Sequence, residues 1–182
     1  MNKRTKELVL AAILTAFSIL ITYSPVKLVL PAFTLTLASH VSTLLAMFIS
    51  PWVTVMTIIG SCIGFAMTIP APNSIIVIAR AASHIIFALV GLKMIRDGKL
   101  NVILIVLITG ILHALAEGLA VFALTPVILP GEAVAVAAGI AVAGTFVHHL
   151  IDCAICAPVA LALGRAKIIH LPKSLLRGNK NA

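Results

Sequence analysis

The chain consists of long apolar segments separated by short stretches that contain Pro, Gly or charged residues. A helix needs about 20 mostly apolar residues to cross the hydrocarbon core of a bilayer, so these segments predict membrane-spanning helices. Six can be drawn with Pro, Gly and charge as their boundaries. They are Glu7–Tyr23, Leu35–Ser50, Trp52–Thr68, Ser74–Ile95, Leu100–Leu124 and Ala133–Leu163.

Two of these boundaries need a further argument. Only Ser50 and Pro51 separate the second segment from the third. Pro suits the first turn of a helix, so we expect a tight helical hairpin there. The first segment has a basic start like a secretory signal, but its apolar run is long and five more segments follow, so we interpret it as a span.

The composition agrees with this class. Hydrophobic residues make up 62% of the 182 residues and charged residues 10%, and the mean hydropathy is +1.21. Such a chain has too little polar surface to cover a soluble globule of its size. We therefore predict one all-α integral membrane domain over residues 1–182, with six transmembrane helices.

The positions of Lys and Arg predict the orientation. With a cytoplasmic N-terminus, only Lys27 lies outside and Arg80 lies within the membrane, as the positive-inside rule requires. Both termini are then cytoplasmic, and the protein is a multi-pass protein of the plasma membrane. The net charge of +8 indicates contact with anionic lipid and no nucleic-acid partner. The cytoplasmic basic residues are Lys3, Arg4, Lys6, Lys93, Arg96, Lys99, Arg165, Lys167, Lys173, Arg177 and Lys180.

Ionisable residues inside the predicted spans are the main functional signal. A charged side chain near the bilayer centre costs about 2.5 to 3.5 kcal/mol, so such residues usually face the bundle interior and serve a ligand, an ion or each other. A spacing of four places two residues on one helix face. The pairs with this spacing are Arg80 and His84, His113 and Glu117, and His148 and Asp152.

Their depths predict one shared chamber. At about 1.5 Å per residue, Arg80 and Glu117 both lie roughly 10 to 12 Å below the outer surface, which makes contact between them possible. His84 and His113 lie deeper, at matching levels. Of the adjacent His148 and His149, we expect only the former to face the chamber, because neighbours on a helix point about 100° apart.

Each role has a structural alternative. Arg80 and Glu117 either form an ion pair that holds two helices, or Arg80 binds a ligand carboxylate while Glu117 orients it. The histidines either bridge helices or donate to ligand oxygens. The candidate substrate-binding residues are Arg80, His84, His113, Glu117, His148, Asn73 and His40.

Metal binding and catalysis are not expected. No compact His-x-His or His-x-x-x-His motif occurs, and Arg80 would repel a cation. Cys153 and Cys156 lie in an apolar span, where packing is the usual role. No nucleophile, zinc-protease or Walker motif is present, so no catalytic residue, enzymatic activity or cofactor is predicted.

Small residues supply a further signal. Ala12 and Ala16 belong to a small-residue stripe on the first span, which allows another helix to approach closely. With six spans, cytoplasmic ends and polar residues in the outer halves of the last three spans, the chain resembles the substrate-binding (S) components of energy-coupling factor (ECF) vitamin transporters. The resemblance covers nearly the whole chain.

The resemblance implies both partners and cargo. Ala12 and Ala16 would dock on a transmembrane scaffold subunit driven by two ATPase subunits. A vitamin would bind in an outward cavity covered by the outer loops near Pro25–Thr34, Ile69–Asn73 and Thr125–Glu132. An arginine beside histidines favours an anion, and the scarcity of Trp and Tyr favours pantothenate over nicotinate, with hydroxymethylpyrimidine less favoured. A self-sufficient proton-coupled carrier is the alternative, because such residues also relay protons.

Overall fold

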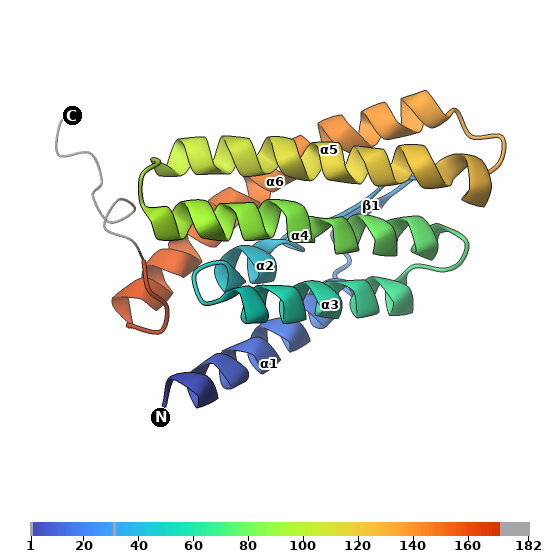
Figure 1. Cartoon of the computed structure of the whole chain (residues 1–182). Coiled ribbons are helices and arrows are strands. Elements are labelled where there is room, and N and C mark those ends of the chain that lie inside the picture. The colour runs from blue at the N-terminus through green and yellow to red at the C-terminus, as the bar shows by residue number, and fades with distance from the viewer. Residues whose placement is uncertain (1, 31, 172–182) are drawn as a thin grey trace.

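The computed structural model describes residues 2–30 and 32–171, which contain six helices and one β-hairpin (Figure 1). The strands β1 (Lys27–Val29) and β2 (Thr34–Thr36) pair antiparallel, with Leu28 opposite Leu35. The chain is therefore an all-α membrane protein with one small hairpin. The helices are α1 (Lys3–Ile21), α2 (Val41–Ala46), α3 (Pro51–Thr68), α4 (Asn73–Asp97), α5 (Val102–Ile128) and α6 (Val134–Arg165).

Four helices in the described part of the chain, α3 to α6, are long and apolar enough to cross a membrane. The helix α1 has the length but begins with four charged side chains, Lys3, Arg4, Lys6 and Glu7. The predicted count of six spans is thus not supported. The cytoplasmic placement of both ends stays a prediction.

The predicted second span, Leu35–Ser50, is wrong as a continuous helix. Its start lies in β2, and α2 has only six residues. Polar and apolar residues alternate from Thr34 to Leu37, which is the period of a strand. Ala38 then has a φ of 66°, outside the helical region.

The predicted turn between the second and third segments is present. Pro51 is the first residue of α3. The N–H at this position has no partner within a helix, so Pro, which lacks it, loses no hydrogen bond there. Ser50 Oγ accepts a hydrogen bond from the backbone N–H of Val53 at 3.3 Å and so caps the helix. The short helix α2 and α3 consequently pack against each other.

The five long helices pack in the series α1, α3, α4, α5, α6, and α2 contacts α1, α3 and α6. In Figure 1, α4 and α5 run side by side and α6 crosses them. The contact between α1 and α3 is close because α3 presents Gly60 and Gly64 to it. Ser18 on α1 also donates to the carbonyl oxygen of Thr57 on α3 at 3.0 Å. The short helix α2 therefore connects the first and the last of the long helices.

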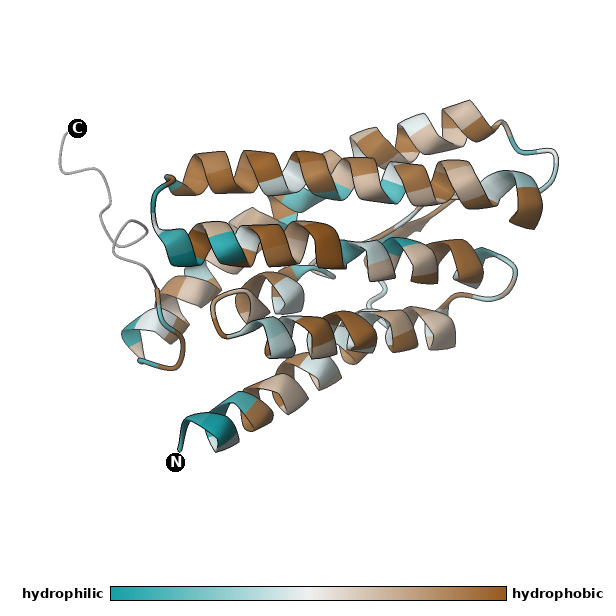
Figure 2. Cartoon of the chain, in the orientation of Figure 1, coloured by the Kyte–Doolittle hydropathy of each residue, from teal (hydrophilic) through white to brown (hydrophobic). Residues whose placement is uncertain are grey.

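The basic residues gather at one end of the bundle. The start of α1, the α4–α5 connection and the end of α6 lie together at this end (Figure 1), and Lys6 Nζ donates to the carbonyl oxygen of Lys167 at 3.2 Å. Figure 2 shows hydrophilic residues at these ends and apolar residues along the helices between them. Of the basic residues used for the orientation, Lys173, Arg177 and Lys180 lie outside the described residues.

Candidate functional site

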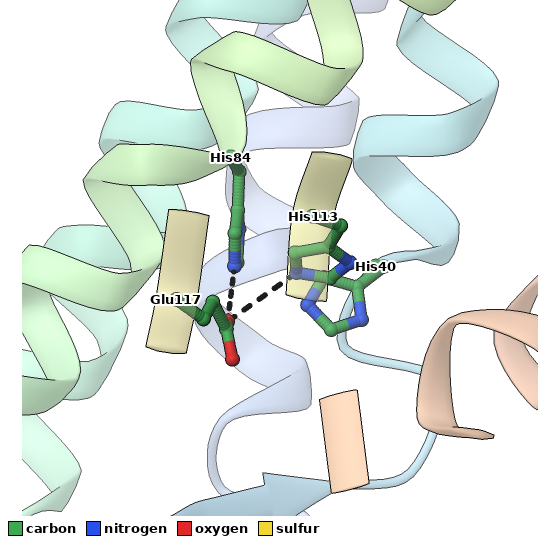
Figure 3. Close-up of side chains that lie close together, drawn as sticks. All are labelled: His40, His84, His113 and Glu117. Atoms are coloured by element: carbon green, nitrogen blue, oxygen red, sulfur yellow. Dashed lines mark hydrogen bonds and ion pairs between the residues drawn. The ribbon is translucent and has the colours of Figure 1, made fainter. Parts of the chain in front are cut away.

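The carboxylate of Glu117, on α5, is the centre of a buried polar cluster. Its Oε2 accepts from Arg80 Nε at 3.0 Å and Nη2 at 2.5 Å, and from the hydroxyl of Thr145. Its Oε1 accepts from His84 Nε2 at 2.9 Å and His113 Nε2 at 3.3 Å (Figure 3). One buried carboxylate thus joins side chains of α4, α5 and α6, with its negative charge opposite the guanidinium.

A second carboxylate, Asp152 on α6, holds the segment before α2. Its Oδ1 accepts from the backbone N–H of Ala38 at 2.9 Å, and its Oδ2 accepts from the backbone N–H and the Nδ1 of His40 at 3.0 and 2.9 Å. His148 Nε2 also lies 3.1 Å from Oδ2, but it makes no hydrogen bond to any described residue. The fully buried Asp152 therefore fixes His40 at the centre of the bundle.

His40 is surrounded by other imidazole rings. Its ring centroid lies 4.6 Å from that of His84, 4.5 Å from that of His113 and 4.7 Å from that of His148, in edge-to-face arrangements. All four side chains are buried. The structure thus brings together histidines from α4, α5, α6 and the segment before α2.

His149 has a different position from His148. Its Nδ1 lies 3.1 Å from His113 Nδ1, and its Nε2 lies 3.1 Å from the hydroxyl oxygen of Thr109. The side chain is fully buried between α5 and α6. Of the two histidines, only His148 lines the small cavity described below, whereas His149 joins the polar cluster through His113.

A small cavity of about 20 Å³ lies beside the cluster. This volume is room for about one water molecule. Arg80 lines it, and the buried Nη1 of Arg80 has no hydrogen-bond partner among the described residues. The ring of Phe33 lies 4.6 Å from the Arg80 guanidinium. The lining residues are Thr34, Thr36, Ser39, His40, Phe65, Val77, Arg80, Ala81, His84, Glu117 and His148.

A larger cavity of about 270 Å³ shares no lining residue with the small one. Its lining is almost entirely apolar and includes Leu44 and Ile105. Thr109, the hydrogen-bond partner of His149, also lines it. The three cysteines are free, and Cys153 and Cys156 lie in this lining.

One predicted site residue lies away from the cluster. Asn73 is the first residue of α4, seven residues before Arg80, and it does not line the small cavity. Seven residues of helix correspond to about 10 Å along the axis. Asn73 is therefore not brought together with the other six candidates.

Several residues of the cluster were not predicted. Thr145 and His149 share the spacing of one helix face with Asp152, and this periodicity was available in the sequence. Thr34, Thr36 and Ser39 reach the cavity from the hairpin segment. No helical spacing indicates them, because this segment is not a helix.

The predicted docking residues lie on a free face of α1 in this single chain. Ala12 and Ala16 are exposed, whereas Ala11, Leu14 and Ser18 are buried. The two sets lie on different sides of the helix, and the buried side faces α3. The role of the exposed alanines stays a prediction.

The chain is similar to the niacin transporter NiaX of Lactococcus lactis subsp. cremoris (strain MG1363). The two are 35% identical over 127 residues, which span 66% of this chain and 56% of the relative. The chain thus covers little more than half the length of the relative that it matches. Neither a family model nor a solved structure gives a significant match.

This similarity and the apolar helices agree with the class that the sequence predicts. The relative is a transporter, which favours a role other than catalysis. The name of the relative gives niacin as its cargo, which corresponds to the nicotinate alternative and gives no support to pantothenate. The chain is a multi-pass protein of the plasma membrane, and its resemblance to the S components of energy-coupling factor vitamin transporters is confirmed.

Proposed function

We propose that this protein is the substrate-capture subunit of an ECF-type vitamin importer and that its cargo is nicotinate. The observation that carries the proposal is the arrangement of Arg80 at the cavity. Glu117 takes two of its donor nitrogens, and Nη1 remains buried without a partner among the described residues. A buried cationic donor of this kind gains most from an anionic acceptor such as a carboxylate.

The surroundings of Arg80 suit a small aromatic acid. Phe33 and Phe65 supply apolar ring faces next to the guanidinium and in the cavity lining. The imidazoles of His84 and His148 supply groups that hydrogen-bond a ring nitrogen or an oxygen. The niacin transporter to which the chain is similar also favours nicotinate over pantothenate.

Binding requires a local rearrangement. The cavity of about 20 Å³ is smaller than a six-membered ring with a carboxylate. Residues of the hairpin segment, Thr34, Thr36 and Ser39, form part of its wall. We expect this segment to move outward when the vitamin enters and to cover it afterwards, with the other outer loops.

The test is a titration of the purified protein in detergent with nicotinate, nicotinamide and pantothenate. Nicotinamide has the same ring but no negative charge, so the comparison removes the charge without altering the protein. We expect stoichiometric binding of nicotinate and at least tenfold weaker binding of nicotinamide, because a charge-assisted hydrogen bond is about twice as strong as a neutral one. Equal affinity for the two ligands would contradict the role of Arg80, and preferential binding of pantothenate would contradict the cargo.

A proton-coupled carrier is the second candidate, and one observation favours it. If both imidazoles are neutral, His113 donates through Nε2 to Glu117, and its Nδ1 accepts from His149 Nδ1–H. His149 Nε2 then accepts from the hydroxyl of Thr109, which lines the large cavity. A hydrogen-bonded chain thus connects Glu117 with the large cavity.

The two candidates differ in what the protein does alone. A carrier transports nicotinate into vesicles that contain this chain only, and a pH gradient drives the uptake. A capture subunit binds the vitamin alone but transports it only with the scaffold, the ATPases and ATP. Uptake of labelled nicotinate is measured in vesicles with this chain alone and in vesicles with the scaffold, the ATPases and ATP. Uptake by the chain alone indicates a carrier, and uptake only by the complete complex indicates a capture subunit.

A further inference from the structure

We infer that the buried cluster of His40, His84, His113 and Glu117 is a binding site for a divalent transition-metal ion of the zinc type. This site goes beyond vitamin capture and does not depend on it. One ligand atom from each of the four residues lies within 4.8 Å of the other three. Figure 3 shows the side chains converging from α4, α5 and the segment before α2.

The spacing of the ligand atoms fits a tetrahedral ion. Bonds of about 2.0 to 2.1 Å place tetrahedral ligand atoms about 3.3 Å apart. Glu117 Oε1 lies 2.9 Å from His84 Nε2 and 3.3 Å from His113 Nε2. Shifts of about 1 Å or less close the remaining distances around an ion. Three imidazoles and one carboxylate are a ligand set that suits Zn²⁺, Co²⁺ and Ni²⁺.

The second ring nitrogens of His40 and His113 also have the hydrogen-bond partners that are typical of histidine ligands to a metal. A histidine ligand usually donates its other ring N–H to a carboxylate or another acceptor. His40 donates its Nδ1–H to Asp152 Oδ2 at 2.9 Å, which leaves Nε2 available for an ion. Asp152 is fully buried and so orients this ring firmly.

The same rule applies to His113. With an ion on Nε2, its Nδ1–H donates to His149 Nδ1, which lies 3.1 Å away. His149 Nε2–H then donates to the hydroxyl oxygen of Thr109, and that hydroxyl donates to the carbonyl oxygen of Ile105 at 2.7 Å. Every donor in this chain has an acceptor, and each imidazole stays neutral.

The position of Glu117 reduces the repulsion that the Arg80 guanidinium would exert on a cation. The guanidinium binds Oε2, while His84 and His113 contact Oε1, so the carboxylate lies between the guanidinium and the ion. Glu117 and Asp152 together offset two of the positive charges. The sequence showed no compact metal motif because the ligands come from three separate segments.

Cobalt is the probe for the first test, because four-coordinate Co²⁺ absorbs visible light much more strongly than six-coordinate Co²⁺. The purified protein in detergent is treated with a chelator, freed of it, and titrated with CoCl₂ and then with ZnCl₂. We expect one Co²⁺ per chain, with the intense four-coordinate spectrum, and its displacement by Zn²⁺. Absence of binding, or a six-coordinate spectrum, overturns the proposal.

Three variants locate the ion. His84→Gln and His113→Gln each remove a ligand but keep a donor for Glu117, and we expect each to bind Co²⁺ more than about tenfold more weakly. His170→Gln is the control, because His170 is exposed and lies outside the cluster. Unchanged affinity in both cluster variants, or a loss of binding in the His170 variant, overturns the assignment.

The Co²⁺ spectrum of the wild-type protein tests the proposed metal site even if a cluster variant does not fold. Nicotinate is titrated separately into the chelator-treated protein. That result tests vitamin capture alone, so the two proposals fail independently.

Discussion

Glu117 compensates the buried charge of Arg80 and accepts hydrogen bonds from two imidazoles and a hydroxyl. Its side chain is 4% exposed, so these protein groups and not bulk solvent satisfy the carboxylate. Removing one member of a buried pair typically costs about 3 to 5 kcal/mol, because the other charge stays buried without compensation. At the scale of single residues, removal of this carboxylate should therefore have a large effect on stability.

The first prediction follows from this role. We expect Glu117→Gln to destabilise the protein by about 3 kcal/mol, because the amide keeps the shape but loses the charge that faces Arg80. Thermal unfolding in detergent measures the change. Glu132→Gln, at an exposed position of the α5–α6 loop, is the matched control and should unfold like the wild type. Equal stability of the two variants would show that Arg80 does not depend on Glu117.

Part of the site could be predicted from single residues. Counting depth along the helices predicted contact between Arg80 and Glu117, and a spacing of four predicted that His148 lies near Asp152. Asn73 was a candidate only because of its polar side chain, and it lies at the first residue of α4, away from the cluster. Depth along straight helices does not describe the hairpin segment, so the positions of His40 and Thr36 could not be derived.

At the scale of elements, the contact between α1 and α3 depends on a missing side chain. A Cβ on Gly60 would lie 2.8 Å from the carbonyl oxygen and 2.8 Å from Cγ2 of Thr15. A backbone oxygen cannot move aside as a flexible side chain can, so a methyl group at this position must push α1 away from α3. Gly139, on α6, has no neighbour within 4 Å of the corresponding position.

The second prediction compares these two glycines. We expect Gly60→Ala to destabilise the protein by about 1 to 3 kcal/mol, which is the usual cost of overpacking. Gly139→Ala should be neutral or slightly stabilising, because Ala favours a helix. Melting temperatures in detergent compare the two. A Gly60 variant as stable as the Gly139 variant would mean that α1 is not packed closely on α3.

The elements also show why the second predicted span was wrong. Residues 35–50 are apolar enough for a helix, and apolar content alone decided the prediction. The strand period from Thr34 to Leu37 and the polar pair Ser39 and His40 were the contrary signals. In the interior of a membrane protein a short non-helical segment is tolerated where it lines a cavity, and here β2 and the turn after it do so.

At the scale of the whole molecule, the exposed alanines of α1 lie apart from the proposed vitamin site. Ala12 and Ala16 are exposed, and none of the residues that line the small cavity belongs to α1. If these alanines receive a scaffold subunit, a larger side chain there should block assembly by its bulk. It should leave the cluster around Glu117 unchanged.

The third prediction therefore separates binding from transport. We expect the double variant Ala12→Leu, Ala16→Leu to bind nicotinate like the wild type but to lose at least tenfold in ATP-dependent uptake by the complete transporter, because close helix approach requires small residues. Vesicle uptake and co-purification with the scaffold measure this. Ala143→Leu, at an exposed position of α6, is the control and should retain uptake. Full uptake by the double variant would place the docking face elsewhere.

The shared carboxylate of Glu117 limits how the proposed vitamin specificity can change by mutation. Arg80, His84, His113 and Thr145 all meet on two oxygen atoms, so replacing one of them alters the partner that the other three contact. Effects of substitutions within such a network are not additive. Directed evolution toward a neutral or cationic vitamin should therefore stall at single steps, and simultaneous replacement of Arg80 and Glu117 is the shorter route to a new specificity.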